Sequence, residues 1–433
     1  MKVFLKKIII VLLRWEARAV LQKFRPRIVA VTGSIGKSST KEAIACILGS
    51  KYFVRQNPKS YNSEFGIPLT ILGLSTPWNS TGGWIMVLLR GFFARFRKEY
   101  PHILVLEAGV DRPGDMDTAL SFMEPQISVV TALGEIPVHV EFFPGPKELA
   151  FEKSKLVRRT LAGGAVILNA DDPMVYEMRR EARGKIITFG FGKEADIRMS
   201  HYALVTNQTG AGTEIPGGIR CKVDYQGSSV PLRMESVYGK QQLYIAAAAI
   251  AVSIQFEFTV LTAVEALVNY QPLAGRLRLL EGIKDSFILD DTYNASPTAM
   301  HAALDALRDM PARRRIAVLG DMLEIGKFTI PAHQQIGELA VGIADILISV
   351  GPRAKFIGRQ AHESGMNESV IHECGNSRDA GVFGQSLLEP GDVVLVKGSQ
   401  SMRMERTVEE IMAHPEQASE LLCRQEEYWK NKV

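Results

Sequence analysis

The stretch Thr32-Gly33-Ser34-Ile35-Gly36-Lys37-Ser38-Ser39 decides how the first half of this chain is expected to fold. It follows an apolar run at 28–31 and precedes a helix-like stretch at 40–48. A strand, a glycine-rich turn and a helix in this order are typical of a phosphate-binding loop, where backbone N–H groups and the helix N-terminus face an anion. The alternative is a glycine turn beside a surface lysine.

The side chains of this loop suit a nucleotide. Lys37 would neutralise the β and γ phosphates, and the Ser38 hydroxyl would ligate Mg²⁺. Val31 stands where the common Walker loop has its first glycine, so this is a rarer, shorter form. We expect these residues to bind ATP: Gly33, Ser34, Ile35, Gly36, Lys37, Ser38 and Ser39.

Composition places the chain among ordinary globular proteins. It has 433 residues, of which 46% are hydrophobic and 23% charged, and this length suggests about three domains. The net charge of +4 is too small to indicate a nucleic-acid partner. The four cysteines are far apart and form no C-x-x-C pair, which argues against a zinc site and fits a reducing cytoplasm.

The N-terminus is basic and apolar. Residues 2–27 carry eight Lys or Arg against the single acid Glu16, around an apolar run at 8–13. That run is too short to span a bilayer, and no small-residue cleavage site accompanies it. Residues 1–26 leave two interpretations open: a basic amphipathic helix on an anionic membrane surface, or a helix packed on the domain's own surface. Residues 84–98 mix Trp and Phe with Arg, which favours either an interfacial helix or a buried helix with a basic rim.

Alternating strand-like and helical stretches fill the first half of the chain. Apolar runs at 103–106, 127–130 and 165–168 indicate buried parallel strands. Residues 195–235 alternate and are rich in glycine, which predicts β-hairpins at the edge of the domain. Residues 241–254 predict a buried helix.

A second alternation begins after Pro272 and Gly275, which indicate a hinge. Strand-like runs then occur at 287–289, 316–319, 346–350 and 393–396, with helices at 298–308 and 332–344 between them. We therefore expect an α/β protein: a basic helix at 1–26, a central P-loop ATPase domain at 27–272 with a mostly parallel sheet, and a Rossmann-like C-terminal α/β domain at 273–433.

Four further motifs carry polar side chains. Glu107 ends an apolar strand, where open α/β sheets place ligands; His139 follows the strand at 127–130; Lys153 lies on the next helix; and Asp290-Asp291 end the first strand of the second domain. Each motif alone is weak evidence for a functional site, because a surface histidine, a solvated lysine or a helix-capping aspartate is the commoner explanation.

Together these motifs resemble the Mur ligases, a family of ATP-dependent amide-forming enzymes of peptidoglycan precursor synthesis. The resemblance runs over residues 27–412. Its marks, beside the T-G-S-x-G-K-S-S loop, are F-G-I-P-L-T at 65–70, E-A-G-V-D-R-P-G-D at 107–115, N-A-D-D-P at 169–173, D-D-T-Y-N-A-S-P at 290–297, L-G-D-M-L-E-I-G at 319–326 and V-K-G-S-Q-S-M-R-M-E at 396–405.

The resemblance implies a role for each matching residue. Lys37 would hold the ATP phosphates, Ser38 and Glu107 one Mg²⁺, and His139 a second Mg²⁺. Lys153 aligns with a lysine that the family carbamylates with CO₂, which would make it a metal ligand. Contacts to the nucleotide would also come from Gln242, Arg276 and Asp291. Candidates for the amine-substrate pocket are Asn294, Ser296, Asp321 and His333.

The implied reaction adds D-alanyl-D-alanine to a UDP-N-acetylmuramoyl-tripeptide through an acyl phosphate, releasing ADP and phosphate. We expect a cytoplasmic monomer whose partners are the muramoyl peptide and D-Ala-D-Ala, with peripheral contact to the inner face of the membrane through residues 1–26 and 84–98. Two alternatives stay open: another Mur or folylpolyglutamate-type ligase with a different or lipid-linked acid, and a non-catalytic ATP-binding scaffold.

The sequence also departs from the family. Only 31 residues precede Thr32, where the family's UDP-sugar-binding domain is expected. Gln241, Gln242 and Ile245 replace the family's adenine-contacting H-N-x-x-N pattern, and Ile245 cannot hydrogen-bond a base. The segment 74–101 is longer than expected. Lys155 stands where the family often has a glutamate, and its charge would lower the pKa of Lys153 if the two side chains come close.

Overall fold

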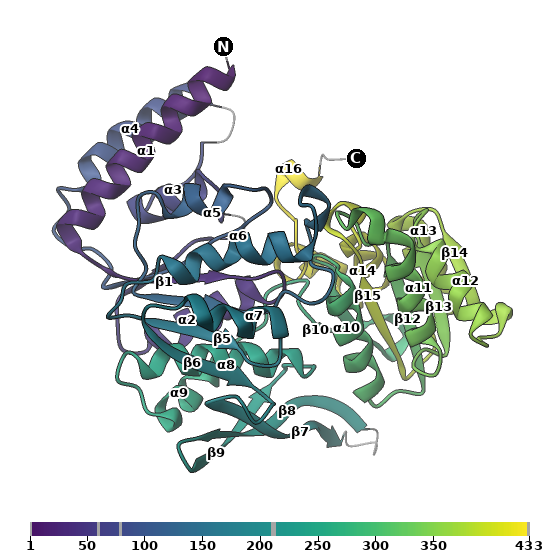
Figure 1. Cartoon of the computed structure of the whole chain (residues 1–433). Helices are drawn as coiled ribbons and strands as arrows, with labels where there is room; N and C mark the ends of the chain where they lie inside the picture. The colour runs from purple at the N-terminus through teal and green to yellow at the C-terminus, as the bar shows by residue number, and fades with distance from the viewer. Residues whose placement is uncertain (1, 59–60, 78–79, 209–213, 431–433) are drawn as a thin grey trace.

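The computed structural model describes residues 2–58, 61–77, 80–208 and 214–430 and places them in two α/β units side by side (Figure 1). In these residues the first sheet has nine strands, and its order begins β2-β3-β1-β4-β5-β6 with all neighbours parallel. These strands are β1 (Arg27–Thr32), β2 (Val54–Gln56), β3 (Ile103–Glu107), β4 (Ile127–Val130), β5 (Ala165–Asn169) and β6 (Lys185–Gly190).

The parallel strands are buried on both faces. Along β1, Val29 and Val31 belong to one apolar core, while Ile28 and Ala30 belong to the core on the opposite face. Successive side chains of a strand point to opposite faces, so a continuous apolar run requires helices on both sides of the sheet.

Helices supply both covers. One core includes side chains of α2 (Lys37–Gly49), α8 (Gln241–Ile254) and α9 (Val260–Leu267). The other face is covered by α1 (Lys2–Phe24), α3 (Gly66–Leu72), α4 (Thr81–Ala94), α5 (Asp115–Leu120), α6 (Pro146–Arg158) and α7 (Pro173–Glu177). The buried helix expected at 241–254 is confirmed as α8.

An antiparallel ribbon extends the first sheet. The sheet ends in β7 (Ile197–Gln208), β8 (Glu214–Tyr225) and β9 (Ser228–Glu235), which pair antiparallel at its edge. The hairpins predicted at 195–235 are thus confirmed.

The second unit has a six-stranded sheet in the described residues, in the order β10-β11-β15-β12-β13-β14, and only the β10 pairing is antiparallel. Its strands are β10 (Arg278–Gly282), β11 (Ser286–Asp291), β12 (Arg314–Gly320), β13 (Ile346–Val350), β14 (Ile371–Cys374) and β15 (Asp392–Lys397). Its helices are α10 (Pro297–Asp309), α11 (Thr329–Ala340), α12 (Lys355–Glu363), α13 (Ser377–Leu387), α14 (Glu405–Ile411), α15 (Ala418–Leu421) and α16 (Glu427–Lys430).

The helix predicted at 332–344 was placed too far toward the C-terminus. It is α11, which begins at Thr329 and ends at Ala340. Gly342 has a φ of 80°, and a left-handed glycine just beyond the last turn stops a helix.

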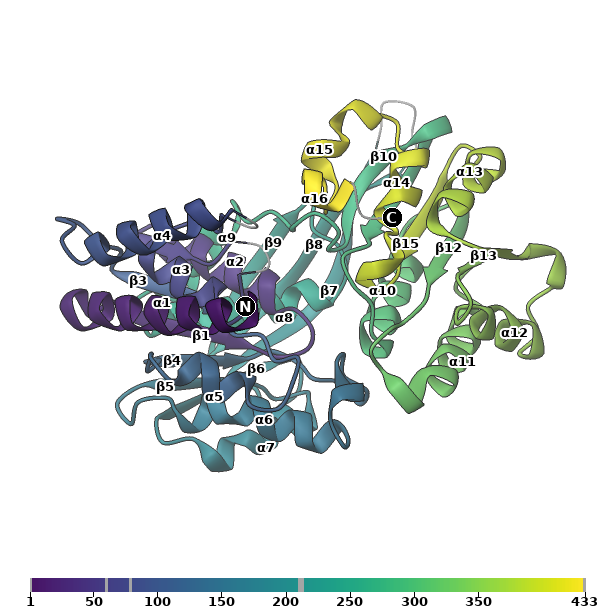
Figure 2. The same cartoon turned by 90° about the horizontal axis from the view of Figure 1, so that it is seen from above.

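Helix α1 lies along α4 and projects with it from the first unit, on the side away from the second sheet (Figures 1 and 2). In α1 the side chains of Leu13, Ala17 and Val20 are fully buried, so one side of the helix packs on the protein's own surface. The interpretation of α4 as a buried helix is wrong, because Ile85, Leu89 and other apolar side chains of α4 are exposed. None of the helices in the described residues combines the length and apolar character needed to cross a bilayer.

A buried ion cluster fixes the C-terminal segment to the second unit. Glu405, at the start of α14, accepts from Arg403 Nε at 2.5 Å and from Arg424 Nη1 at 2.8 Å, and all three residues are buried. Arg424 also donates to the carbonyl oxygens of Thr292 and Tyr293, in the loop after β11. The cluster therefore holds that loop in place.

We expect Glu405→Gln to destabilise the fold. The neutral amide would leave two buried guanidinium groups without a counter-charge, a loss of about 3 kcal/mol. Thermal and urea unfolding would measure it, with the exposed Glu409→Gln on the same helix as the control. An unfolding midpoint for Glu405→Gln equal to that of the control would contradict this account.

Candidate functional site

The loop between β1 and α2 has the backbone that its glycines allow. Gly33 has a φ of 144°, and a Cβ there would overlap Thr131 Oγ1. Gly36 has a φ of 80° immediately before α2. The amides of Ser34 and Ile35 donate to the Ala132 carbonyl at 2.7 and 3.1 Å, which ties the loop to the end of β4. Since α2 begins at Lys37, the amides of its first turn have no carbonyl partner within the helix and suit an anion.

Glu107 lies directly beside this loop. Its Oε2 accepts from Ser38 Oγ at 2.8 Å, and its Oε1 accepts from Asn62 Nδ2 at 3.1 Å. Asn57 accepts from the Glu107 amide through Oδ1 at 2.8 Å, which fixes the strand end. Burial raises the pKa of Glu107, but Lys37, Ser38, Lys41 and Asn62 more than offset this, so the pKa lies below its usual value. Glu107 is therefore a buried carboxylate held in the charged form.

Two lysines meet this carboxylate. Burial lowers the pKa of Lys37; Glu107 opposes that effect and Arg276 adds to it. Burial, followed by the charge of Lys37, lowers the pKa of Lys153 to about 7, against opposition from Asp111 and Glu107. Lys153 is buried, and Lys37 and Arg276 are half-buried. These positive groups near the Glu107 carboxylate favour an anionic ligand.

Lys155 does not act on Lys153 as the sequence suggested. Its ammonium pairs with Asp117 and, at 2.7 Å, with Glu152. Glu152 also accepts from the amides of Gly114 and Met116 at the start of α5. The low pKa of Lys153 results from burial and Lys37 instead, because the charge of Lys155 is already matched by two carboxylates.

His139 has a left-handed backbone, with a φ of 69°, and reaches across to the second unit. Its Nδ1 lies 2.8 Å from Glu324 Oε2, and its Nε2 lies 3.4 Å from Asp111 Oδ1. The contact with His139 lowers the pKa of Glu324. Within the described ranges, no group of three or more His, Cys, Asp or Glu side chains surrounds a common metal position. The oxygen pair of Ser38 and Glu107 suits Mg²⁺, whereas His139 is engaged with Glu324.

The expected nucleotide contacts lie around the junction of the two units. The Arg276 guanidinium stacks on the Tyr293 ring at 4.1 Å, and the Arg276 carbonyl accepts from Gln242 Nε2 at 3.2 Å. Tyr270 donates to Gln242 Oε1 at 3.3 Å, so both ends of this buried amide have protein partners. Asp291 is buried and pairs with Lys397 Nζ at 2.6 Å. Both ends of the Gln242 amide are thus engaged within the protein, whereas Asp291 is engaged with Lys397 through Oδ2.

The side chains of the four amine-pocket candidates all make hydrogen bonds within the second unit. Ser296 Oγ accepts from the Ala299 amide as the N-cap of α10, and Asn294 Oδ1 accepts from the Ala295 amide. Asp321 accepts from the amides of Arg353 and Ala354 before α12. His333 is fully buried between the Met322 amide and the Thr329 carbonyl, and burial lowers its pKa. Their role toward a substrate stays a prediction.

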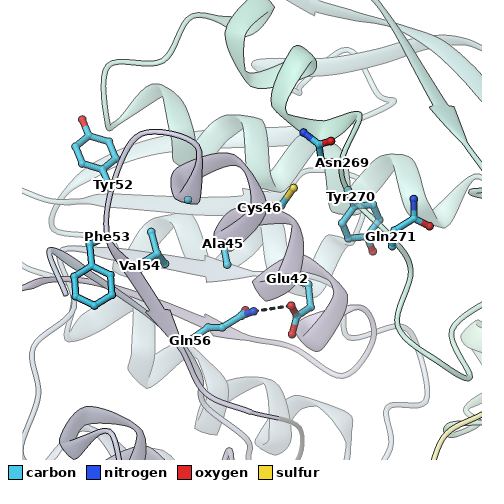
Figure 3. A pocket seen from close by; sticks show the side chains of 11 residues that line it. Glu42, Ala45, Cys46, Tyr52, Phe53, Val54, Gln56, Asn269, Tyr270 and Gln271 are labelled. Carbon is cyan, nitrogen blue, oxygen red and sulfur yellow. Dashed lines mark hydrogen bonds between the residues drawn. The ribbon is translucent and has the colours of Figure 1, made fainter. Parts of the chain in front are cut away.

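A narrow cleft opens where the phosphate loop faces the second unit. Ser38 and Arg276 line it from one side, and Tyr293, Arg424 and Trp429 line it from the other. A separate cavity of about 490 Å³ lies beside α2, where Glu42 Oε2 accepts from Gln56 Nε2 at 2.6 Å (Figure 3). It is also lined by Cys46 and Tyr270, so it adjoins the Gln242 contact described above.

Sequence reasoning missed several residues of this site. Asn57 and Asn62 orient Glu107, Asp111 and Glu324 flank His139, and Arg424 comes from the end of the chain. A polar loop between two apolar elements signals Asn57 and Asn62, and Asp111 lies within the 107–115 motif. Nothing in the local pattern signals Arg424, since it reaches the cleft only through the tertiary fold.

Two family profiles match this chain: "Mur ligase middle domain" over residues 31–253 and "Mur ligase, glutamate ligase domain" over residues 275–400. A UDP-N-acetylmuramoyl-tripeptide--D-alanyl-D-alanine ligase of Bacillus subtilis (strain 168) is 26% identical over 401 residues, which are 92% of this chain and 79% of that protein. The structure of MurF from Acinetobacter baumannii aligns with a TM-score of 0.75 at 23% identity over 92% of this chain and 79% of that one. MurF ligase from Thermotoga maritima, in complex with ADP, aligns with a TM-score of 0.73 at 24% identity over 93% and 83%.

We expect Glu107→Gln to weaken Mg²⁺-dependent ATP binding by at least about tenfold, because the amide removes the charge that faces Ser38. Calorimetric titration of ATP with and without Mg²⁺ would measure this. Glu42→Gln, in the second turn of α2, is the matched control and should bind as the unmodified protein does. Equal Mg²⁺ dependence in both variants would remove Glu107 from the metal site.

We expect Lys153 to form a carbamate whose amount depends on pH. With a pKa of about 7, the neutral amine that attacks CO₂ predominates at pH 8 and falls to about one tenth at pH 6. Nuclear magnetic resonance with ¹³C-bicarbonate would detect the carbamate carbon. Lys153→Gln should lose the signal and Lys155→Gln should keep it. A signal that survives Lys153→Gln, or that grows on acidification, would refute the assignment.

Proposed function

The chain belongs to the Mur ligase family, and we propose that it joins D-alanyl-D-alanine to a UDP-N-acetylmuramoyl-tripeptide. It is an ATP-dependent ligase that forms a C–N bond. The observation that carries ATP-dependent ligation is the Ser38–Glu107 oxygen pair at the phosphate loop, beside a cleft that both units line. The acid and the amine proposed are those that the names of the relatives give.

The reaction requires activation of a carboxylate, which an amine does not attack at neutral pH. A carboxylate oxygen of the acid attacks the γ-phosphorus of ATP, the bond to the β–γ bridging oxygen breaks, and ADP leaves. The amine nitrogen then attacks the acyl carbon of the acyl phosphate. It loses a proton, and inorganic phosphate leaves from the tetrahedral intermediate. Lys37 and Arg276 offset the negative charge that gathers on the transferring phosphoryl group.

The residues present fit the metal and the carbamate that the family implies. Ser38 and Glu107 offer two oxygens 2.8 Å apart, and Mg²⁺ bound there would supply charge neutralisation for the phosphates. Lys153 is a buried amine that is partly neutral at pH 7, so it suits addition of CO₂. We propose that the carbamate, with His139, holds a second Mg²⁺ once His139 exchanges Glu324 for the metal.

The nucleotide would lie between the units. We propose that Arg276 and Asp291 contact it from the linker and the second unit, while Gln242 retains its contact to the Arg276 carbonyl. Closure about residues 272–276 would then bring the second unit onto the phosphate loop and exclude water. The second unit would supply the pocket for the amine, with Asn294 and Asp321 at strand ends facing the cleft side of the sheet.

We also propose that the enzyme is a cytoplasmic monomer that contacts the inner face of the membrane peripherally, through residues 1–26 and 84–98. The exposed apolar side chains of α1 and α4 support this location. The same surface favours one alternative acid, a lipid-linked one, because such a substrate would be concentrated where the enzyme docks.

The reaction predicts that phosphate release from ATP, with Mg²⁺ and bicarbonate, requires both UDP-muramoyl-tripeptide and D-Ala-D-Ala. The product should be heavier than the tripeptide substrate by the dipeptide less one water. Lys37→Ala should abolish release. If ATP binds but neither substrate alone nor the pair elicits phosphate, the acid is a different one, and lipid-linked precursors become the next acids to assay.

A further inference from the structure

One solvent-exposed face of the molecule carries many apolar side chains. More than half of the large apolar side chains that are exposed in the described residues lie on α1, on α4 and in the turn after α4. Val11 and Phe93 are 63% and 62% exposed. A concentration of this kind on a single face marks an interaction surface. We call it the α1–α4 face; its members are Leu5, Ile8, Val11, Leu12, Trp15, Ile85, Met86, Leu89, Phe92, Phe93 and Phe96.

Helical spacing makes this face continuous. In α1, Leu5, Ile8, Leu12 and Trp15 recur at intervals of three and four residues, which places them on one side of the helix. Ile85, Leu89, Phe92 and Phe96 repeat the pattern along α4 and its following turn. The two stripes meet where the Trp15 and Phe92 rings stack, with centroids 6.5 Å apart.

The opposite sides of both helices are anchored to the domain. Leu13, Ala17 and Val20 of α1 are fully buried, and Val87 and Ala94 of α4 are buried as well. Gly91 allows the close approach, because a Cβ there would overlap the buried Glu16 carboxylate. Both helices are thus anchored to the first unit, on its side away from the second sheet (Figure 2).

Charge identifies the occupant. Lys7 and Arg90 are exposed at the edges of the two stripes, and Lys98 follows α4. Glu16 is the single acidic residue of α1 and α4, and it is buried. In a twofold dimer the same patch meets itself, so basic side chains would face basic side chains. An apolar stripe with a basic border instead matches an anionic lipid surface, where apolar side chains enter the acyl boundary and basic groups pair with headgroups.

We propose that the α1–α4 face docks on a bilayer that contains anionic lipid. The inference rests on the peripheral location proposed above and names its surface and its lipid. The exposed aromatic rings of Trp15, Phe92 and Phe93 would lie at headgroup depth, with Lys7 and Arg90 at the phosphates. Docking would leave the cleft between the two units free, because no residue of α1 or α4 lines it and both helices project from the first unit away from the second sheet.

Co-sedimentation of the full chain with vesicles tests the proposal. We would compare phosphatidylcholine vesicles with vesicles that also contain about 30% phosphatidylglycerol. The double variant Val11→Ser, Phe93→Ser should bind the anionic vesicles at least about tenfold more weakly. Lys7→Glu with Arg90→Glu should remove the preference for anionic over neutral vesicles. Val382→Ser, a 58% exposed position of α13, is the matched control and should bind as the unmodified protein does.

Three outcomes would overturn the proposal: no binding to either vesicle, binding that none of the variants changes, or a self-association of the free protein that the Val11→Ser, Phe93→Ser variant abolishes. The last would assign the face to a second copy. Phosphate release with soluble substrates, measured on the same variants, should equal that of the unmodified protein, because none of these residues lines the cleft. A failure of docking is therefore distinguishable from a failure of the proposed ligation.

Discussion

The buried charge of Glu107 is the constraint on which the site depends. A carboxylate without partners would be neutral at this depth, yet it ends a central parallel strand and is held ionised by Lys37, Ser38 and Asn62. Its charge opposes the effect of burial, which lowers the pKa of both Lys37 and Lys153, and the charge of Lys37 lowers the pKa of Lys153 further. The charges of these residues therefore depend on one another, and an anionic ligand would balance the positive groups among them.

The second unit completes this arrangement through a few contacts between the halves. His139 meets Glu324, Tyr202 donates to Asp309 at 2.8 Å, and Gln242 binds the Arg276 carbonyl. Apolar side chains also cross the junction, because Val140 and Tyr238 of the first unit belong to an apolar core of the second. The α1–α4 face lies on the first unit and would stay fixed to it during the closure proposed above.

Much of the fold was predictable because its signals are local. Apolar runs bounded by polar or glycine residues gave the positions of β3, β4 and β5, and the alanine-rich stretch gave α8. The end of α11 was misjudged, since the apolar pattern continues past Gly342 although the backbone there is left-handed. The phosphate loop, Glu107 and Lys153 were identified because the motifs that contain them have a characteristic order along the chain.

The sequence by itself determined the secondary structure, the two alternations of strand and helix and the residue types of the site, because periodicity and motif spacing act between near neighbours. Only the tertiary structure decided the state of those residues. Burial and the charge of Lys37, not the neighbouring Lys155, set the pKa of Lys153; Glu324 engages His139; and Lys397 engages Asp291. Electrostatic energies depend on the distances between groups in space and on their burial, which the order of residues along the chain does not give. The exposure of side chains also depends on the tertiary structure: the stripes of α1 and α4 become one face only because the two helices pack side by side.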